Sequence, residues 1–164
     1  MRGPSKEKQL LNSDFRDILS AFCGEKVEFM LVGAYAVAAH GLPRATGDID
    51  LWIECSEENA DRVWSALSKF GAPLDNLSKQ DFLRHGTVVQ LGVSPRRIDI
   101  LTQITGVDYE EAKPNRISID LEGVTVPVIG LTQLLQNKSA VGRPQDEADV
   151  ARLKQMQLRE ERES

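Results

Sequence analysis

The stretch LVGAYAVAAHGLPRATGDIDLWIE, residues 31–54, contains the pattern that decides the fold. An apolar run ends at Gly33, an alanine-rich segment continues to Gly41, and a second apolar run carries Asp48 and Asp50 with one isoleucine between them. Side chains at positions i and i+2 of a strand point to the same face, so these two carboxylates must stand side by side. Like charges at that distance repel each other, and the pair therefore predicts a proton or a metal ion close by.

Length and composition limit the class of protein. The chain has 164 residues, of which 41% are hydrophobic and 27% charged, and its formal net charge is -5. These values are typical of a globular protein, and no apolar run approaches the ~20 residues of a membrane span. The first residues lack the apolar stretch of a secretory signal, so we expect a cytoplasmic protein with a single domain over residues 1–164 and no membrane partner. The acidic charge disfavours a protein whose main task is to coat nucleic acid.

The two cysteines indicate neither a disulfide framework nor a zinc site. Cys23 and Cys55 are far apart in the sequence and belong to no Cys-x-x-Cys motif or Cys/His cluster. Cysteines without such spacing are more often plain thiols. We therefore expect two buried free thiols.

Hydrophobic periodicity and turn residues divide the chain into helices and strands. Helices are predicted at residues 10–22, 34–41, 56–70, 131–141 and 145–162. Strands are predicted at residues 27–33, 47–54, 116–121 and 124–129, with two more between residues 87 and 101. Residues 71–86 give no clear prediction. This order indicates an α+β fold in which a mixed β-sheet of about five strands is flanked by helices, with a core at about 27–129 and C-terminal helices at about 131–162.

A third acid is predicted to join the pair. Asp99 interrupts an otherwise apolar strand, RRIDIL (residues 96–101), where an isolated ionised carboxylate is costly. Three acids inside apolar strands need a common partner, and Mg²⁺ prefers hard oxygen ligands together with substrate phosphates. Three carboxylates are enough for two such ions, the arrangement used for in-line phosphoryl or nucleotidyl displacement. We therefore predict that Asp48, Asp50 and Asp99 bind two Mg²⁺ ions, with Mn²⁺ as the alternative metal.

The turn at Gly33 and Ala34 is the second predicted part of the site. A glycine between a strand and a helix allows backbone N–H groups to approach a ligand closely, and a helix N-terminus favours an anion. We expect phosphate oxygens at this turn. The loop with Arg44 and Thr46 leads directly into the carboxylate strand, so both residues are candidates for contact with the same substrate.

These segments together resemble a known family. Residues 31–54, followed by RRIDIL and by NKSAVGRPQDEADVARL (residues 137–153), are similar to the minimal nucleotidyltransferase-like proteins of the DNA polymerase β superfamily. Their signature is a strand, a Gly-Ser or Gly-Gly pair that opens a helix, an Asp-x-Asp or Asp-x-Glu strand, and a later strand with a third Asp. The resemblance covers about residues 27–153. It is greatest to small prokaryotic members, whose relatives include antitoxin-linked and abortive-infection nucleotidyltransferases.

The resemblance implies a reaction and a role for each residue. Asp48 and Asp50 would bind two magnesium ions. Asp99 would complete the ion that activates an acceptor hydroxyl for attack on the α-phosphate of a nucleoside triphosphate, with pyrophosphate as the leaving group. Gly33 and the amide of Ala34 would hold the β- and γ-phosphates. Lys138, in the later helix, is a further candidate for contact with the triphosphate.

One departure from the family keeps a second function open. The position after Gly33 is Ala34, where the family commonly has Ser or Gly, so a hydroxyl that helps to hold phosphate is absent. The first hypothesis is a metal-dependent nucleotidyltransferase with an unknown acceptor, which is a protein, an RNA or a small molecule. The alternative is a catalytically weak or inactive nucleotide-binding module that acts through a protein partner, as an antitoxin-like regulator does.

The candidate residues also have purely structural interpretations. Asp99 can form an ion pair with Arg96 or Arg97 and nothing more. Arg44 can anchor its loop, and Lys138 can extend from a helix face with its charge in solvent. A network that fastens the last helix to the core is the favoured interpretation of three further residues: Arg143, Asp146 and Asp149.

Overall fold

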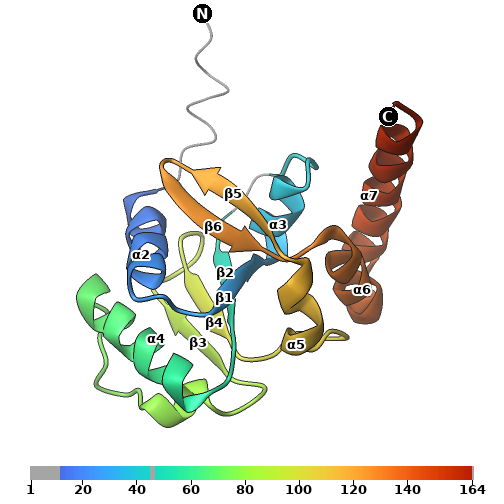
Figure 1. Ribbon diagram of the computed structural model, residues 1–164. Helices are drawn as coiled ribbons and strands as arrows, with labels where there is room; N and C mark the ends of the chain where they lie inside the picture. The colour runs from blue at the N-terminus through green and yellow to red at the C-terminus, as the bar shows by residue number, and fades with distance from the viewer. Residues whose placement is uncertain (1–11, 45–46, 164) are drawn as a thin grey trace, which may run out of the picture.

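The computed structural model describes residues 12–44 and 47–163 (Figure 1). Its strands form one six-stranded mixed sheet in the order β3-β4-β2-β1-β6-β5, one strand more than the approximate five expected. The strands are β1 (Phe29–Val32), β2 (Ile49–Ile53), β3 (Val88–Leu91), β4 (Ile98–Leu101), β5 (Ile117–Leu121) and β6 (Val124–Val128). The α-helices are α2 (Ser13–Gly24), α3 (Gly33–Ala39), α4 (Glu57–Phe70), α5 (Tyr109–Ala112), α6 (Leu131–Val141) and α7 (Pro144–Glu163). The predicted α+β class is confirmed.

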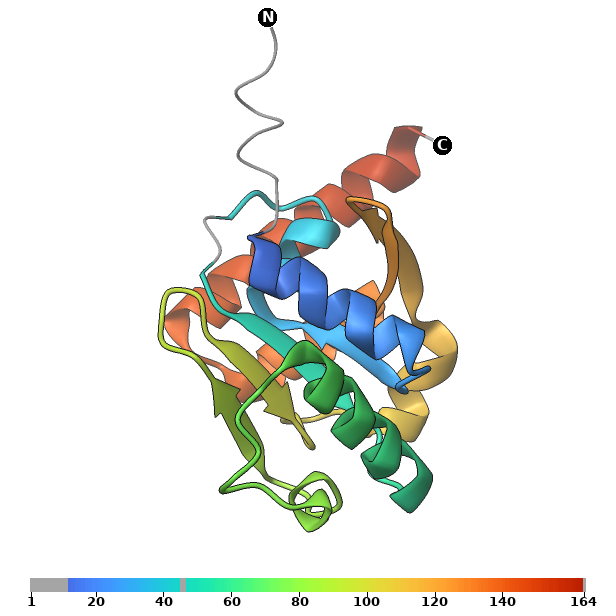
Figure 2. The ribbon, with the colours of Figure 1, turned by 90° about the vertical axis from the view of Figure 1, so that its left-hand side faces the viewer.

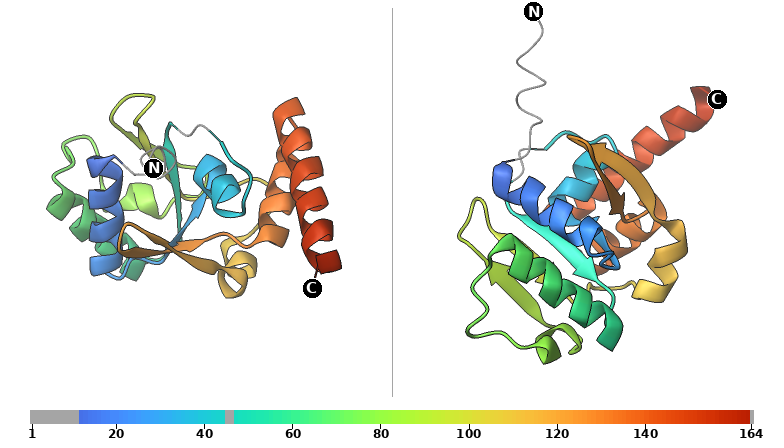
Figure 3. Two further views of the ribbon diagram at one scale, coloured as in Figure 1. Left: turned by 90° about the horizontal axis from the view of Figure 1, so that it is seen from above. Right: turned by 60° about the vertical axis from the view of Figure 1, so that its left-hand side comes forward.

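The sheet is the middle layer of the molecule. Seen from above, α2 and α4 lie on one side of it, and α3 lies with α6 and α7 on the other (Figure 3). The view from the left-hand side shows α2 and α4 next to each other across the strands (Figure 2). Helices on both sides explain why all four residues of β1 are buried. The largest fully buried side chains include Phe15, Phe22, Phe29, Trp52 and Phe82.

Local sequence signals fix the helix ends. Asn12 caps α2, since its Oδ1 accepts a hydrogen bond from the N–H of Phe15 at 2.9 Å. Ser56 caps α4 in the same way, through the N–H of Asn59 at 3.2 Å. The helix α4 ends at Gly71, whose φ of +91° is the left-handed conformation that glycine adopts without strain. The predicted start of α4 is confirmed, whereas residues 10 and 11 of the first predicted helix lie outside the described residues.

Strand pairing places the predicted acids. The strands β1 and β2 are antiparallel, and β2 pairs with β4 in parallel. In these registers Asp50 lies opposite Val32 on one side and Asp99 on the other. On the far side of β4, Gln90 of β3 lies opposite Asp99. Directly opposite residues in neighbouring strands share a face, so this row crosses the sheet on one face.

Several short elements were not predicted. The 3₁₀ helices η1 (Lys79–Phe82) and η2 (Lys113–Asn115), together with the four-residue α5, are too short to show helical periodicity in the sequence. The two cysteines are free, as expected, but each is half-buried rather than buried. Along residues 12–44 and 47–163, none of the helices has the length and apolarity needed to cross a membrane.

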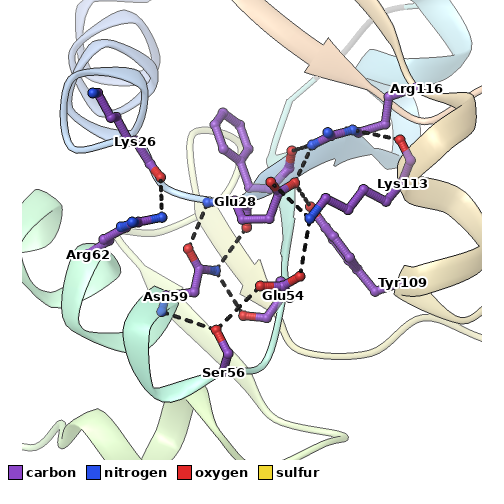
Figure 4. Close-up of polar contacts among 10 residues, drawn as sticks. Lys26, Glu28, Glu54, Ser56, Asn59, Arg62, Tyr109, Lys113 and Arg116 are labelled. Carbon is purple, nitrogen blue, oxygen red and sulfur yellow. Dashed lines mark hydrogen bonds and ion pairs between the residues drawn. The ribbon is translucent and has the colours of Figure 1, made fainter.

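A polar cluster joins the sheet to α4 and α5 at the end of β1 and β2 opposite to α3 (Figure 4). Asn59 is 2% exposed, and its Nδ2 donates hydrogen bonds to the carbonyl oxygens of Glu28 and Glu54 at 2.9 and 2.8 Å. The Glu28 carboxylate pairs with Arg116 and accepts a hydrogen bond from the Tyr109 hydroxyl at 3.0 Å. Burial and the Glu28 carboxylate raise the pKa of Tyr109. These groups satisfy one another, so we assign the cluster a structural role.

Candidate active site

Three carboxylates meet at one end of β2 and β4. Asp50 is the second residue of β2, Asp48 precedes that strand by one residue, and Asp99 is the second residue of β4. Asp50 and Asp99 lie directly opposite each other in the paired strands. Asp99 is 7% exposed, whereas Asp48 and Asp50 are half-buried. The structure thus pairs Asp50 with Asp99 and places Asp48 directly before β2.

A cation already lies among these acids. The Nε and Nη2 atoms of Arg97 donate to the two carboxylate oxygens of Asp99 at 2.7 and 3.0 Å. Nη2 of Arg97 is also 3.4 Å from Oδ2 of Asp48. The same Oδ2 accepts a hydrogen bond from the Ser94 hydroxyl at 2.8 Å, and Oδ1 of Asp48 accepts one from the Arg97 N–H at 2.9 Å. Of the two arginines considered as partners of Asp99, Arg97 makes the ion pair.

The three acids have different electrostatic environments. Burial, followed by the charges of Asp99 and Asp48, raises the pKa of Asp50 to about 7. The pKa of Asp48 is lowered, first by its hydrogen bond from the Arg97 N–H and then by the Ser94 hydroxyl. Burial and Asp99 therefore contribute more to the raised pKa of Asp50 than the repulsion from Asp48 that the sequence pattern predicted.

Gly33 brings the backbone close to Asp50. It lies between β1 and α3 with a φ of +70°, in the left-handed region that favours glycine. A Cβ atom at this position would overlap Oδ2 of Asp50 and lie 3.0 Å from its Cγ. Only a residue without a side chain allows the carboxylate to sit against this turn. The predicted turn and the predicted acids are therefore one site.

The carboxylates fit a divalent metal by chemistry but are not arranged around one. Within the described parts of the chain, no three or more His, Cys, Asp or Glu side chains form a group that could hold a metal ion. Asp48, Asp50 and Asp99 nevertheless offer the hard oxygen donors that Mg²⁺ prefers. In the present arrangement Arg97 and Ser94 occupy oxygens of Asp48 and Asp99. The three carboxylates therefore fit Mg²⁺ when Arg97 and Ser94 no longer occupy the oxygens of Asp48 and Asp99.

Arg44 and Lys138 belong to a separate network that joins the loop before β2 to α6 and α7. Lys138, 8% exposed, lies 3.1 Å from Oδ1 of Asp146 and 3.0 Å from Oδ2 of Asp149. Arg44 pairs with Asp149, and Nε of Arg143 donates to Asp146 at 2.7 Å. The Arg143 hydrogen bond is the main cause that lowers the pKa of Asp146 to about 2. The structure thus contains the fastening network that the sequence suggested, while contact of Arg44 and Lys138 with substrate stays a prediction.

Thr46 and Ala34 are two further predicted substrate contacts. Thr46 lies outside the described residues. Ala34 is the second residue of α3, directly after the Gly33 turn. Sequence reasoning did not single out Ser94, whose hydroxyl donates to Asp48. The signal for Arg97 was present, because Arg97 and Asp99 are at i and i+2 of the same strand segment and so face the same way.

A hollow with a volume of about 480 Å³ lies along the outer edge of the sheet at β3. Gln90 of β3 lines this hollow and lies opposite Asp99 of β4, so the hollow is one strand away from the acids. The other lining residues are Pro73, Asp75, Asn76, Leu77, Asp81, Thr87, Val88, Val89, Leu91 and Gly92.

Comparison with solved structures identifies the fold. A candidate nucleotidyltransferase of Thermotoga maritima, TM1012, is similar over 98% of this chain and 96% of its own, with a TM-score of 0.58 and 18% identity. The chain has a nucleotidyltransferase-like fold. The lincosamide antibiotic adenylyltransferase LnuA, solved with lincomycin bound, is similar over 89% of this chain and 98% of its own, with a TM-score of 0.58 and 16% identity. No family model and no curated protein sequence matches the chain.

The close contact between Gly33 and Asp50 predicts how a side chain at this turn would change stability. We expect Gly33→Ala to lower the free energy of unfolding by more than the ~1 kcal/mol of a left-handed alanine, because its methyl group also displaces the Asp50 carboxylate. Gly71→Ala is the matched control, since Gly71 has a φ of +91° with nothing within 4 Å of the added atom. Denaturant unfolding of both variants measures the difference. Equal losses would show that Asp50 does not lie against the turn.

The pKa of Asp50 predicts how stability depends on pH. Between about pH 4 and 7 the unfolded chain loses the Asp50 proton while the folded protein keeps it, so this group makes folding less favourable as pH rises. Above pH 7 the penalty is constant. We expect Asp50→Asn to unfold with a free energy about 2–4 kcal/mol higher than the wild type at pH 8, and with no such gain at pH 4. Chemical denaturation in chelator at both pH values tests this.

The variant Asp48→Asn is the control for this titration. The hydrogen bonds from Arg97 and Ser94 lower the pKa of Asp48, so its ionised form stabilises the fold. Loss of that charge should therefore reduce stability at pH 8 instead of increasing it. A gain in both variants would mean that general charge reduction, and not burial of Asp50, is responsible.

Removal of Lys138 separates its two predicted roles. We expect Lys138→Met to lower the free energy of unfolding by about 3 kcal/mol, because Asp146 and Asp149 then lose a cation in a buried setting. Lys154→Met on the exposed face of α7 is the control and should change stability little. Nucleotide affinity, measured by calorimetry on the folded variant, checks the substrate role. An unchanged dissociation constant would leave Lys138 with the structural role alone.

Proposed function

We propose that the protein is a metal-dependent nucleotidyltransferase that moves a nucleoside monophosphate from a nucleoside triphosphate to a hydroxyl acceptor. One arrangement supports this proposal: in a nucleotidyltransferase-like fold, Asp50 lies against the Gly33 turn and opposite Asp99, and Arg97 forms ion pairs with both Asp99 and Asp48. An adenylyltransferase, LnuA, is among the proteins that share this fold. Neither the acid cluster alone nor the fold alone would be sufficient, because acid clusters are common on strands and one fold hosts many functions.

The proposed roles follow from the positions of the residues. Asp48, Asp50 and Asp99 would hold the divalent ions, Mg²⁺ or Mn²⁺, which when bound offset the negative charge of the carboxylates and of the triphosphate. The turn at Gly33 and Ala34 lies against Asp50 and is the proposed contact of the β- and γ-phosphates. The acceptor oxygen forms a bond to the α-phosphorus, the bond to the β-phosphate oxygen breaks, and pyrophosphate leaves. Asp99 is the proposed group that orients the acceptor hydroxyl and takes its proton.

The acceptor is proposed to approach from the side of β3. Gln90 is the neighbour of Asp99 in the sheet and lines the hollow of about 480 Å³ at the sheet edge. That volume lies within the range of small-molecule sites, which favours a small molecule over RNA or protein among the three acceptor classes. LnuA, a fold neighbour, was solved with the small molecule lincomycin bound.

Pyrophosphate release tests the proposal. The protein is incubated with Mg²⁺, each of the four α-labelled ribonucleoside triphosphates and a panel of hydroxyl-bearing small molecules, RNAs and proteins. We expect label transfer and pyrophosphate release with at least one combination. Asp48→Asn and Asp50→Asn should each reduce the rate by at least about 100-fold, a usual loss when a group that stabilises transition-state charge is removed.

The control for this assay is Asp17→Asn, which removes a carboxylate from the exposed face of α2. Its rate should equal that of the wild type. Wild-type rates in Asp50→Asn would contradict the proposed role of the acids.

A nucleotide-binding regulator without transferase activity is the second candidate. Ala34 provides no hydroxyl at the turn. Arg97 already neutralises the charge of Asp99, so part of the acid cluster has a cationic partner without a metal. In that case nucleotides bind, as seen by calorimetry, but no acceptor yields pyrophosphate. Such a protein would act through a protein partner, in the manner of an antitoxin-like module.

A further inference from the structure

The Arg97 side chain contacts two of the three acids, whereas a simple surface ion pair joins one cation to one carboxylate. Its guanidinium binds both oxygens of Asp99, approaches Asp48 at 3.4 Å, and donates to the Ser94 hydroxyl at 3.2 Å through Nη1. All of these partners lie at or beside the three acids. The Arg97 side chain therefore has the position that a cation shared by Asp48 and Asp99 would take.

A divalent ion and this guanidinium would compete for the same carboxylates. The forked contact of Arg97 takes one lone pair of each Asp99 oxygen and points its positive charge between the carboxylates. A second cation a few ångströms away would be repelled in a partly buried site, where charges are weakly screened. Entry of the ion therefore requires that the guanidinium leave Asp99.

The backbone permits this exchange without disturbing the sheet. The Arg97 N–H donates to Oδ1 of Asp48 at 2.9 Å, and the Arg97 carbonyl accepts from the N–H of Ile49 at 3.0 Å. Both contacts use main-chain atoms of Arg97, so rotation of the Arg97 side chain does not itself break them. The side chain is 29% exposed and donates no hydrogen bond to a backbone carbonyl among the described residues, so rotation toward solvent breaks only its contacts with Asp48, Asp99 and Ser94.

We propose that Arg97 is a resident counter-cation that exchanges with the divalent ion: it holds Asp48 and Asp99 together in the ion-free protein and leaves Asp99 when the ion binds. This inference rests on the metal site of the proposed function. Arg97 is then a positioning residue for the carboxylates, and the affinity for the ion is reduced by the free energy of breaking its ion pairs.

Binding of Mn²⁺ to the nucleotide-free protein tests the exchange. Free Mn²⁺ is measured by electron paramagnetic resonance in titrations of the wild type, Arg97→Gln, Arg97→Lys, Arg96→Gln and Asp50→Asn, the last of which should not bind the ion. Removal of the competitor should make Arg97→Gln bind about tenfold tighter, equivalent to about 1.4 kcal/mol. Arg97→Lys, which keeps the charge without the fork, should fall between Arg97→Gln and the wild type. Arg96→Gln removes the exposed neighbouring arginine and should bind as the wild type does.

The outcomes separate this inference from the function on which it rests. Equal or weaker binding by Arg97→Gln, with binding still abolished by Asp50→Asn, overturns the exchange and leaves the metal site in place. Absence of Mn²⁺ binding in every variant overturns both. A second measurement uses the unaltered protein, in case Arg97→Gln does not fold: the Nε–H resonance of Arg97 should shift and exchange faster with water on addition of Mg²⁺. An unchanged resonance at saturating Mg²⁺ also overturns the exchange.

Discussion

The parallel pairing of β2 with β4 is the constraint on which the site depends. It places Asp50 directly opposite Asp99, two carboxylates on one face of neighbouring strands, where like charges destabilise the sheet. The surrounding contacts limit this cost. Arg97 binds Asp99. Burial raises the pKa of Asp50, the other acid of the facing pair, to about 7. An arrangement that costs folding energy and is compensated locally is typical of sites kept for function and not for stability.

The turn before α3 depends on the same pairing. Because β1 lies on the other side of β2, the residue that follows β1 arrives at the Asp50 carboxylate. Gly33 resolves the crowding by having no side chain, and its left-handed backbone redirects the chain into α3. The strand order β4-β2-β1 therefore assembles the acids and the turn at one place, and neither part would be positioned if β2 were at an edge of the sheet.

Much of this arrangement could be predicted from local sequence signals. Gly33, Ser56 and Gly71 marked boundaries that the structure has, whereas Asp48 lies just before β2, so the i, i+2 rule for a strand does not fix its direction relative to Asp50. The pairing of Asp50 with Asp99 could not be derived from spacing, because strand order depends on contacts between distant segments. The partners of Lys138 were equally inaccessible, since a lysine on a helix has the same local pattern whether its charge is solvated or paired. Short elements such as α5 gave no periodicity at all.

The two outer helices are attached to the body of the protein by different forces. The helix α2 buries four apolar side chains, whereas the buried residues of α7 are two aspartates and one leucine, and most of its C-terminal half is exposed. Apolar burial needs no charged partner, but a contact made mostly of charges depends on its partners staying in place. The helix α7 therefore has the features expected of a separate cooperative unit: few buried apolar side chains and an exposed C-terminal half. Amide hydrogens of α7 would then exchange with solvent through local opening, and those of β1 only through global unfolding.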